Sequence, residues 1–175
     1  SLAVAMIPAK SQIQSDPVVI IAGGPGQSML DSYPMLHPAL NDVRRNRNIL
    51  LMDARGTGAS HLLQCDEIVS LGENADDSDD PAKLRVLTER CRDRLAKTSD
   101  LRFYATADHI RDLDLLRATI GVDRLNLAGI SYGTRVAQQY AARYPEHTRT
   151  VTLDSIAPNT LVLGQEHALN LDADI

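Results

Sequence analysis

The sequence predicts an α/β fold in which helices flank a mostly parallel sheet. Short, almost continuously apolar runs recur along the chain, each bounded by Gly, Pro or Asp, as is typical of strands that are covered on both faces. Segments with apolar residues at helical spacing separate the later runs. The chain has 175 residues, 43% of them hydrophobic, which is enough for one compact domain with a substantial core.

Five apolar runs are predicted to be strands, because they are short and rich in β-branched and aliphatic residues. They cover residues 2–7, 17–23, 48–53, 124–129 and 150–155. The first run lacks the basic segment of a signal peptide, so it is interpreted as a strand.

Three helices are predicted from the spacing of apolar residues. They cover residues 80–97, 106–121 and 133–145. Thr106 is the expected N-cap of the second helix and Gly121 its C-terminal stop, while Pro145 is expected to end the third helix.

Charge and hydropathy exclude several classes of protein. The net charge is −5 and basic residues are mixed with acidic ones, so the basic face of a nucleic-acid-binding protein is not expected. The sequence contains no apolar run of about 18 residues, and therefore no membrane span is expected. No cofactor and no metal site are expected either.

A serine lies between two glycines at the end of the fourth predicted strand. Residues 129–133, Gly-Ile-Ser-Tyr-Gly, match G-x-S-x-G in the strand-to-helix setting of a nucleophile elbow. Glycine suits positions 129 and 133 because side chains there would collide where the strand and the helix cross. The helix N-terminus behind Ser131 offers free N–H groups for a developing negative charge. The alternative is a glycine-rich turn in which Ser131 merely caps the helix.

A second glycine-rich loop, residues 22–28 (AGGPGQS), follows the second predicted strand. Such a turn exposes backbone N–H groups, as a second oxyanion donor requires. Phosphate binding is not supported, because neither G-x-G-x-x-G nor G-K-[ST] follows. An ordinary tight loop remains the alternative.

A third polar segment, residues 52–60 (MDARGTGAS), follows the third predicted strand. This segment contains two oppositely charged residues, Asp53 and Arg55, two positions apart. We interpret this Asp–Arg pair as a tie between loops rather than as catalytic machinery.

Together these three motifs resemble the α/β-hydrolase fold, and in particular the prolyl iminopeptidase and tripeptidyl aminopeptidase group of serine peptidases. The likeness continues through residues 108–158 and covers nearly the whole chain. Ala22 stands where the iminopeptidases usually carry a histidine, which favours the tripeptidyl aminopeptidase branch.

The resemblance implies roles for three residues. Ser131 matches the nucleophile, and the N–H group of Tyr132 matches one oxyanion donor. The glycine pair in GGPG matches the other donor, for which Gly24 is preferred over Gly23. The implied substrate is a peptide with a free N-terminus or a small ester. The alternative function is a non-catalytic or inactive module that binds a ligand or a partner.

The residues alone leave the state of Cys65 and Cys91 open between two free thiols and one disulfide. The resemblance implies a disulfide, because the pair looks like one in secreted members of the group. A disulfide in turn implies an oxidising location, so the expected location is the periplasm or outside the cell.

The catalytic base and its acid are not convincingly present. In this fold they follow the nucleophile in the order Asp or Glu, then His. His109 precedes Ser131 and is expected to be solvated or to cap a helix, and His147 is expected at the far end of the third helix. Asp154 is interpreted as structural, and His167 lies in the tail.

We therefore expect that these residues are part of a larger hydrolase. Residues 1–160 would form the N-terminal part of the catalytic domain, and residues 161–175 would begin a helical cap. The first sheet strand, the rest of the cap, the last two strands and the catalytic Asp and His would lie outside this chain, which alone should show little turnover.

Overall fold

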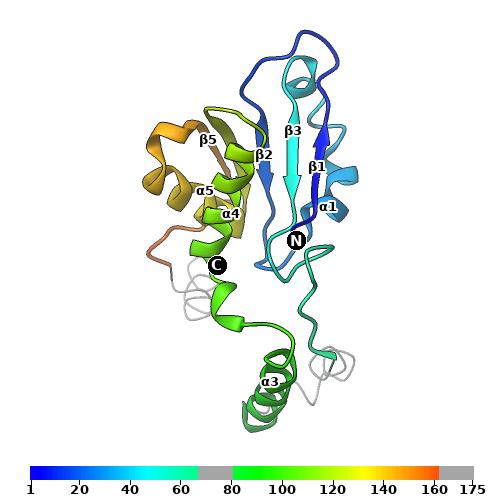
Figure 1. Ribbon diagram of the computed structural model, residues 1–175, viewed down its shortest axis with the longest axis vertical. Helices are drawn as coiled ribbons and strands as arrows, with labels where there is room; N and C mark the ends of the chain where they lie inside the picture. The colour runs from blue at the N-terminus through cyan, green and yellow to red at the C-terminus, as the bar shows by residue number, and fades with distance from the viewer. Residues whose placement is uncertain (67–80, 162–175) are drawn as a thin grey trace, which may run out of the picture.

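Five strands form one sheet in the computed structural model, which describes residues 1–66 and 81–161 (Figure 1). The order across the sheet is β1-β3-β2-β4-β5. The strands are β1 (Val4–Ile7), β2 (Val18–Ile21), β3 (Ile49–Met52), β4 (Leu125–Ile130) and β5 (Thr148–Asp154). The strand β1 is antiparallel to β3, whereas all other neighbours are parallel. The predicted fold class and all five predicted strands are thus confirmed.

The three predicted helices are present as α3 (Pro81–Leu95), α4 (Thr106–Thr119) and α5 (Tyr132–Arg143). A fourth helix, α1 (Met29–Leu36), was not predicted, because Pro34 lies inside it and proline normally interrupts helices. Ser28 is the N-cap of this helix, and serine is a residue type that commonly begins helices. Its side chain accepts a hydrogen bond from the Asp31 N–H group at 3.1 Å.

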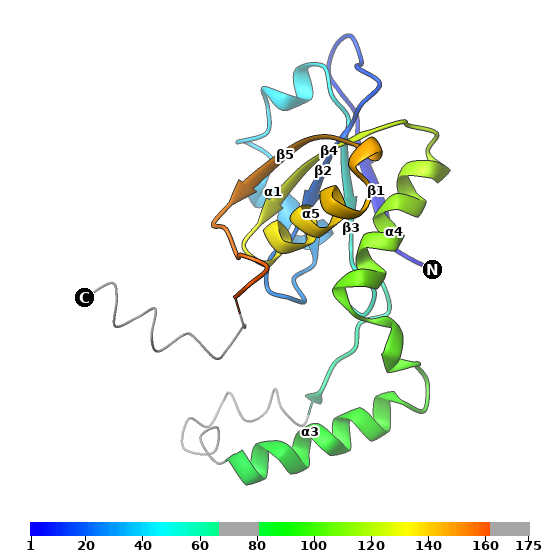
Figure 2. The ribbon, with the colours of Figure 1, turned by 90° about the vertical axis from the view of Figure 1, so that its left-hand side faces the viewer.

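Helices cover both faces of the sheet (Figure 2). The helices α4 and α5 pack on one face, and α1 packs on the other. Alternate residues of β2 divide between these layers, with Val19 and Ile21 facing α4 and α5, and Val18 and Ile20 facing α1. Burial on both faces explains why the strands read as continuous apolar runs.

The start of α4 differs from the prediction, whereas its end is as predicted. The N-cap is Ala105 rather than Thr106, and its N–H group donates to the Asp108 carboxylate at 3.2 Å. At the other end Gly121 has a φ of +72°, and the N–H group of Val122 bonds to the carbonyl of Arg117 at 3.2 Å. This is the left-handed glycine stop that the sequence predicted.

The helix α3 lies on the side of the sheet at which β2 and β3 end, apart from the packed layers (Figure 1). Only Cys91 of this helix is buried, and a disulfide joins it to Cys65, the pairing that the resemblance implies. The Arg94 guanidinium adds a hydrogen bond to the Gln64 carbonyl at 2.9 Å. Among the described residues, no helix is both long and apolar enough to cross a bilayer.

Replacing both Cys65 and Cys91 by Ser should release α3 and leave the sheet intact, because the disulfide is the main buried link of this helix. Tryptic cleavage within α3 is expected to accelerate roughly tenfold, whereas α4 and α5 stay protected. A time course of limited proteolysis read by mass spectrometry measures both. Equal cleavage of α3 in the variant and the parent protein would contradict this role of the disulfide.

Candidate active site

Ser131 occupies a strained corner between β4 and α5. Its φ is +52° and its ψ is −118°, a region that non-glycine residues rarely adopt. Backbone hydrogen bonds hold the corner: the Ser131 N–H group donates to the carbonyl of Asp154 at 2.9 Å, and its carbonyl accepts from the N–H group of Thr134 at 3.0 Å. The side chain of Ser131 is exposed. Asp154 thus supports the corner through its backbone.

The two glycines of the G-x-S-x-G motif allow backbones to meet directly. A Cβ atom at Gly129 would collide with the carbonyl oxygen of Gly133, and a Cβ atom at Gly133 would collide with the carbonyl oxygen of Ile21 on β2. Both positions therefore exclude every other residue type. The steric reason for the motif that the sequence suggested is present in the structure.

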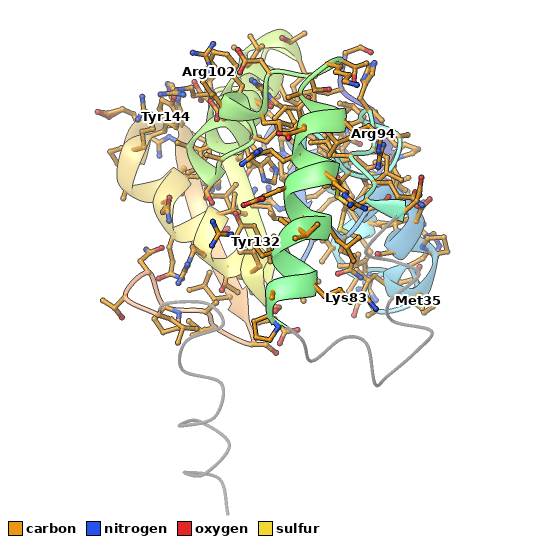
Figure 3. The ribbon with its side chains drawn as sticks, turned by 90° about the horizontal axis from the view of Figure 1, so that it is seen from below. Met35, Lys83, Arg94, Arg102, Tyr132 and Tyr144 are labelled. Carbon is orange, nitrogen blue, oxygen red and sulfur yellow. A yellow bond between two sulfur atoms is a disulfide. The ribbon has the colours of Figure 1, made fainter. Side chains whose placement is uncertain are left out.

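The glycine-rich loop after β2 lies against the serine. A Cβ atom at Gly23 would be 3.2 Å from the Cβ atom of Ser131, and the next residue, Gly24, has a φ of +103°. Within the described part of the chain, the N–H groups of Gly24 and Tyr132 have no hydrogen-bond acceptor. Figure 3 views the side at which β2, β3 and β4 end, and Tyr132 lies near the middle of this face.

A buried carboxylate, that of Asp53, holds the end of the glycine-rich loop after β2 through hydrogen bonds. Asp53 is 1% exposed and accepts hydrogen bonds from the Ser28 hydroxyl at 3.0 Å and from the N–H groups of Met29 and Leu30 at 2.8 and 3.1 Å. The N–H group of Ala59 donates to it at 3.0 Å. A negative charge at the first turn of α1 is also favoured by the helix dipole. Asp53 therefore joins the start of α1 to the loop after β3.

Arg55 has other partners than the Asp53 that the sequence suggested. Its guanidinium forms two bonds to the Asp112 carboxylate on α4, at 2.6 and 2.7 Å, and one to the Phe103 carbonyl at 3.2 Å. The prediction that Asp53 and Arg55 pair with each other is therefore wrong. Each residue nevertheless ties loops together, as expected, through a partner that is distant in sequence.

A small cavity lies beside the corner between β4 and α5, between the 25–26 turn and the start of α4. Its volume is about 230 Å³, and its lining includes Thr106, His109 and Tyr132. The Tyr132 and Thr106 hydroxyls share a hydrogen bond of 2.5 Å. Burial lowers the pKa of His109 from 6.5 to about 4, against the opposing attraction of Asp112. His109 is half-buried. The expectation that it caps the helix is wrong, because Asp108 takes the capping role.

No histidine in the described part of the chain hydrogen-bonds to Ser131. His37, at the carboxyl end of α1, hydrogen-bonds to the Tyr33 hydroxyl. His147 lies past the end of α5, where its Nδ1 atom is 2.7 Å from the Asp114 carboxylate. His167 and the expected cap at 162–175 lie outside the described residues. The Ser131 hydroxyl likewise has no hydrogen-bond partner among the described residues.

The strand order, together with a positive-φ serine between β4 and α5, defines the architecture of an α/β hydrolase. The family model described as "alpha/beta hydrolase fold" matches residues 16–174. The chain therefore belongs to the α/β-hydrolase fold family.

Curated relatives include peptidases. The tripeptidyl aminopeptidase of Streptomyces coelicolor is 31% identical over an alignment 168 positions long, which covers 87% of this chain and 30% of the relative. Serine protease Hip1 of Mycobacterium tuberculosis is 28% identical over an alignment 163 positions long, which covers 81% of this chain and 30% of the relative. This chain thus spans about 30% of the length of these relatives. The resemblance to the prolyl iminopeptidase and tripeptidyl aminopeptidase group is confirmed.

A solved structure shows the same fold. The crystal structure of the proline iminopeptidase of Mycobacterium smegmatis matches 85% of this chain and 38% of its own chain, with a TM-score of 0.54 and 19% identity. The match places the sheet and its helices in the common hydrolase arrangement.

Asp53→Asn should destabilise the protein by about 2–3 kcal/mol, because an amide nitrogen cannot accept the buried hydrogen bonds that one carboxylate oxygen now receives. Urea denaturation of the full-length protein measures the change. Asp123→Asn is the matched control at an exposed site and should change the unfolding free energy by less than about 0.5 kcal/mol. Equal effects of the two variants would contradict the anchoring role of Asp53.

Acidification should destabilise the protein through His109. Since its folded-state pKa of about 4 lies below the ordinary 6.5, the unfolded chain binds the proton first, and stability falls as the pH decreases from 6.5 towards 4. In His109→Gln, the loss of unfolding free energy between pH 7 and pH 5 should shrink by about 2 kcal/mol.

Urea denaturation at both pH values measures this difference. The control His61→Asn alters an exposed histidine and should keep the full loss. If His109→Gln kept it as well, burial of His109 would not be the cause.

Proposed function

We propose that this chain carries the nucleophile and the oxyanion hole of a serine hydrolase of aminopeptidase type. The observation that carries the proposal is the strained corner of Ser131. The corner exposes Ser131 against the loop that carries Gly24. The N–H groups of Gly24 and of the adjacent Tyr132 have no acceptor among the described residues. Strain at such a position is commonly retained for function.

The proposed chemistry is acyl transfer. The Ser131 Oγ atom attacks the carbonyl carbon of the substrate, and the N–H groups of Gly24 and Tyr132 donate to the oxygen of the tetrahedral intermediate. Collapse expels the amine or alcohol and leaves an acyl-enzyme, which water then hydrolyses. The N-terminal end of α5 adds a favourable field at the developing negative charge.

The base that activates Ser131 is proposed to come from the part of the protein outside these 175 residues. Two observations support this: the chain spans about 30% of the length of its peptidase relatives, and no histidine of the described residues hydrogen-bonds to Ser131. Residues 1–160 would then be the N-terminal part of the catalytic domain, and residues 161–175 would begin the cap. The remainder would supply the cap, an Asp and a His.

The substrate is proposed to be a peptide with a free N-terminus, with a small ester as a second possibility. Relatives named tripeptidyl aminopeptidase and proline iminopeptidase support the peptide. The disulfide of Cys65 and Cys91 supports a location in the periplasm or outside the cell, because disulfides persist in oxidising compartments.

Ser131→Ala in the full-length protein should abolish labelling by a fluorophosphonate probe, because the reactive oxygen is removed. Hydrolysis of peptide and ester substrates should fall by at least about 1,000-fold. Ser11→Ala, at an exposed serine, should label like the parent protein. No labelling of the folded parent protein would overturn the proposal and favour a non-catalytic binding module instead.

A further inference from the structure

We propose that the cavity beside the corner between β4 and α5 is a substrate subsite that binds one uncharged residue of a peptide through His109, Thr106 and Tyr132. The inference rests on the proposed peptidase function and specifies what its site accepts. It follows from the position of the cavity, from the pairing of its charged groups and from one histidine that has no partner.

The position of the cavity ties it to the reacting bond. Pro25 and Gly26 line it and directly follow Gly24, whereas Tyr132 lines it from the other side and directly follows Ser131. A group in the cavity would therefore lie close to the bond that Ser131 attacks. The volume of about 230 Å³ is smaller than the roughly 300–1,000 Å³ of pockets that hold whole small molecules. It suits one residue of a longer substrate.

The charged side chains around the cavity already have counter-charges. Arg55 is paired with Asp112 through two hydrogen bonds. Asp108 pairs with Arg111 at 2.8 Å and accepts from the N–H group of Ala105 at 3.2 Å. A charged substrate group would thus lose water without gaining a free counter-ion, which is costly. The cavity therefore selects against ammonium and carboxylate groups.

His109 is the polar group that still needs a partner. Its imidazole has no hydrogen-bond partner among the described residues, and the residue is half-buried where it lines the cavity. Because burial lowers its pKa to about 4, the ring is neutral at pH 7 and offers one N–H donor and one acceptor nitrogen. A ring nitrogen that faces the cavity can therefore hydrogen-bond to a neutral amide, whose N–H group donates and whose carbonyl oxygen accepts.

The hydroxyl groups of Thr106 and Tyr132 are the other neutral polar groups that line the cavity. Thr106 and Tyr132 bond to each other at 2.5 Å, and since only one of them donates in that bond, one hydroxyl hydrogen remains for a ligand. Phe103 and Tyr104 also line the cavity and can pack against the aliphatic part of a side chain. Glutamine and asparagine combine such a part with a neutral amide, and so fit the cavity better than glutamate or lysine.

The test compares peptides that differ in one residue near the scissile bond, with Gln, Glu or Lys at each position in turn, using the full-length protein. At one position, kcat/KM should be about tenfold higher for the Gln peptide than for the Glu and Lys peptides. About tenfold is the change expected from one additional hydrogen bond. In His109→Leu, the ratio of kcat/KM for the Gln peptide to that for p-nitrophenyl acetate should fall about tenfold, mainly through KM.

Two variants sharpen the interpretation. His109→Gln keeps a donor and an acceptor and should restore most of the ratio, which a merely structural role would not require. His61→Asn changes a histidine outside this cavity and should leave the ratio as in the parent protein. If His109→Leu does not fold, Thr106→Val replaces it and should raise KM for the Gln peptide about threefold or more.

The outcomes separate the two proposals. A parent protein that neither reacts with a fluorophosphonate nor hydrolyses p-nitrophenyl acetate would overturn the serine-hydrolase proposal itself. A reactive parent protein that cleaves the Gln, Glu and Lys peptides equally at every position would overturn the subsite alone. An unchanged ratio in His109→Leu, or an unchanged KM in Thr106→Val, would do the same.

Discussion

Direct backbone contact at the crossing of β4, α5 and β2 is the constraint on which the rest of the structure depends. Gly129 approaches the carbonyl of Gly133, and Gly133 approaches the carbonyl of Ile21, so a side chain at either position would separate the elements. With the elements this close, the chain has one residue in which to turn from strand to helix. That residue is Ser131, whose φ of +52° is the consequence of the crossing. The same approach brings the loop after β2 against the serine, so that the steric fit and the proposed oxyanion site have a common origin.

A second constraint, electrostatic rather than steric, fixes the loops around this corner. The Asp53 carboxylate is buried and gathers donors from the start of α1 and from the loop after β3. Arg55 pairs with Asp112 and so attaches the same loop to α4. These contacts hold the segments that frame the cavity at His109. Buried charges with several good partners have few alternative arrangements, which favours one geometry for the site.

The fold was largely predictable from the sequence, for a local reason. Strands buried on both faces must be apolar at successive positions, as Val18 to Ile21 show, and the glycine stop of α4 needs one residue at positive φ, which Gly121 supplies. Prediction failed where two local rules conflicted. Ser28 signals the start of α1, but Pro34 signals a break, and packing on the sheet decides in favour of the helix. At α4 the cap moves by one residue because Asp108 binds the Ala105 N–H group.

The sequence by itself determined the corner between β4 and α5, because a strand and a helix that cross so closely need glycine at 129 and 133. It also determined the type of sheet. Only the tertiary structure decided the partners of the polar groups: that Asp53 binds α1, that Arg55 reaches Asp112, and that His109 lines the same cavity as Tyr132. The physical reason is that local backbone geometry depends on neighbours in sequence, whereas burial and hydrogen bonding depend on neighbours in space. These spatial neighbours are set when α1 and α4 pack on opposite faces of the sheet.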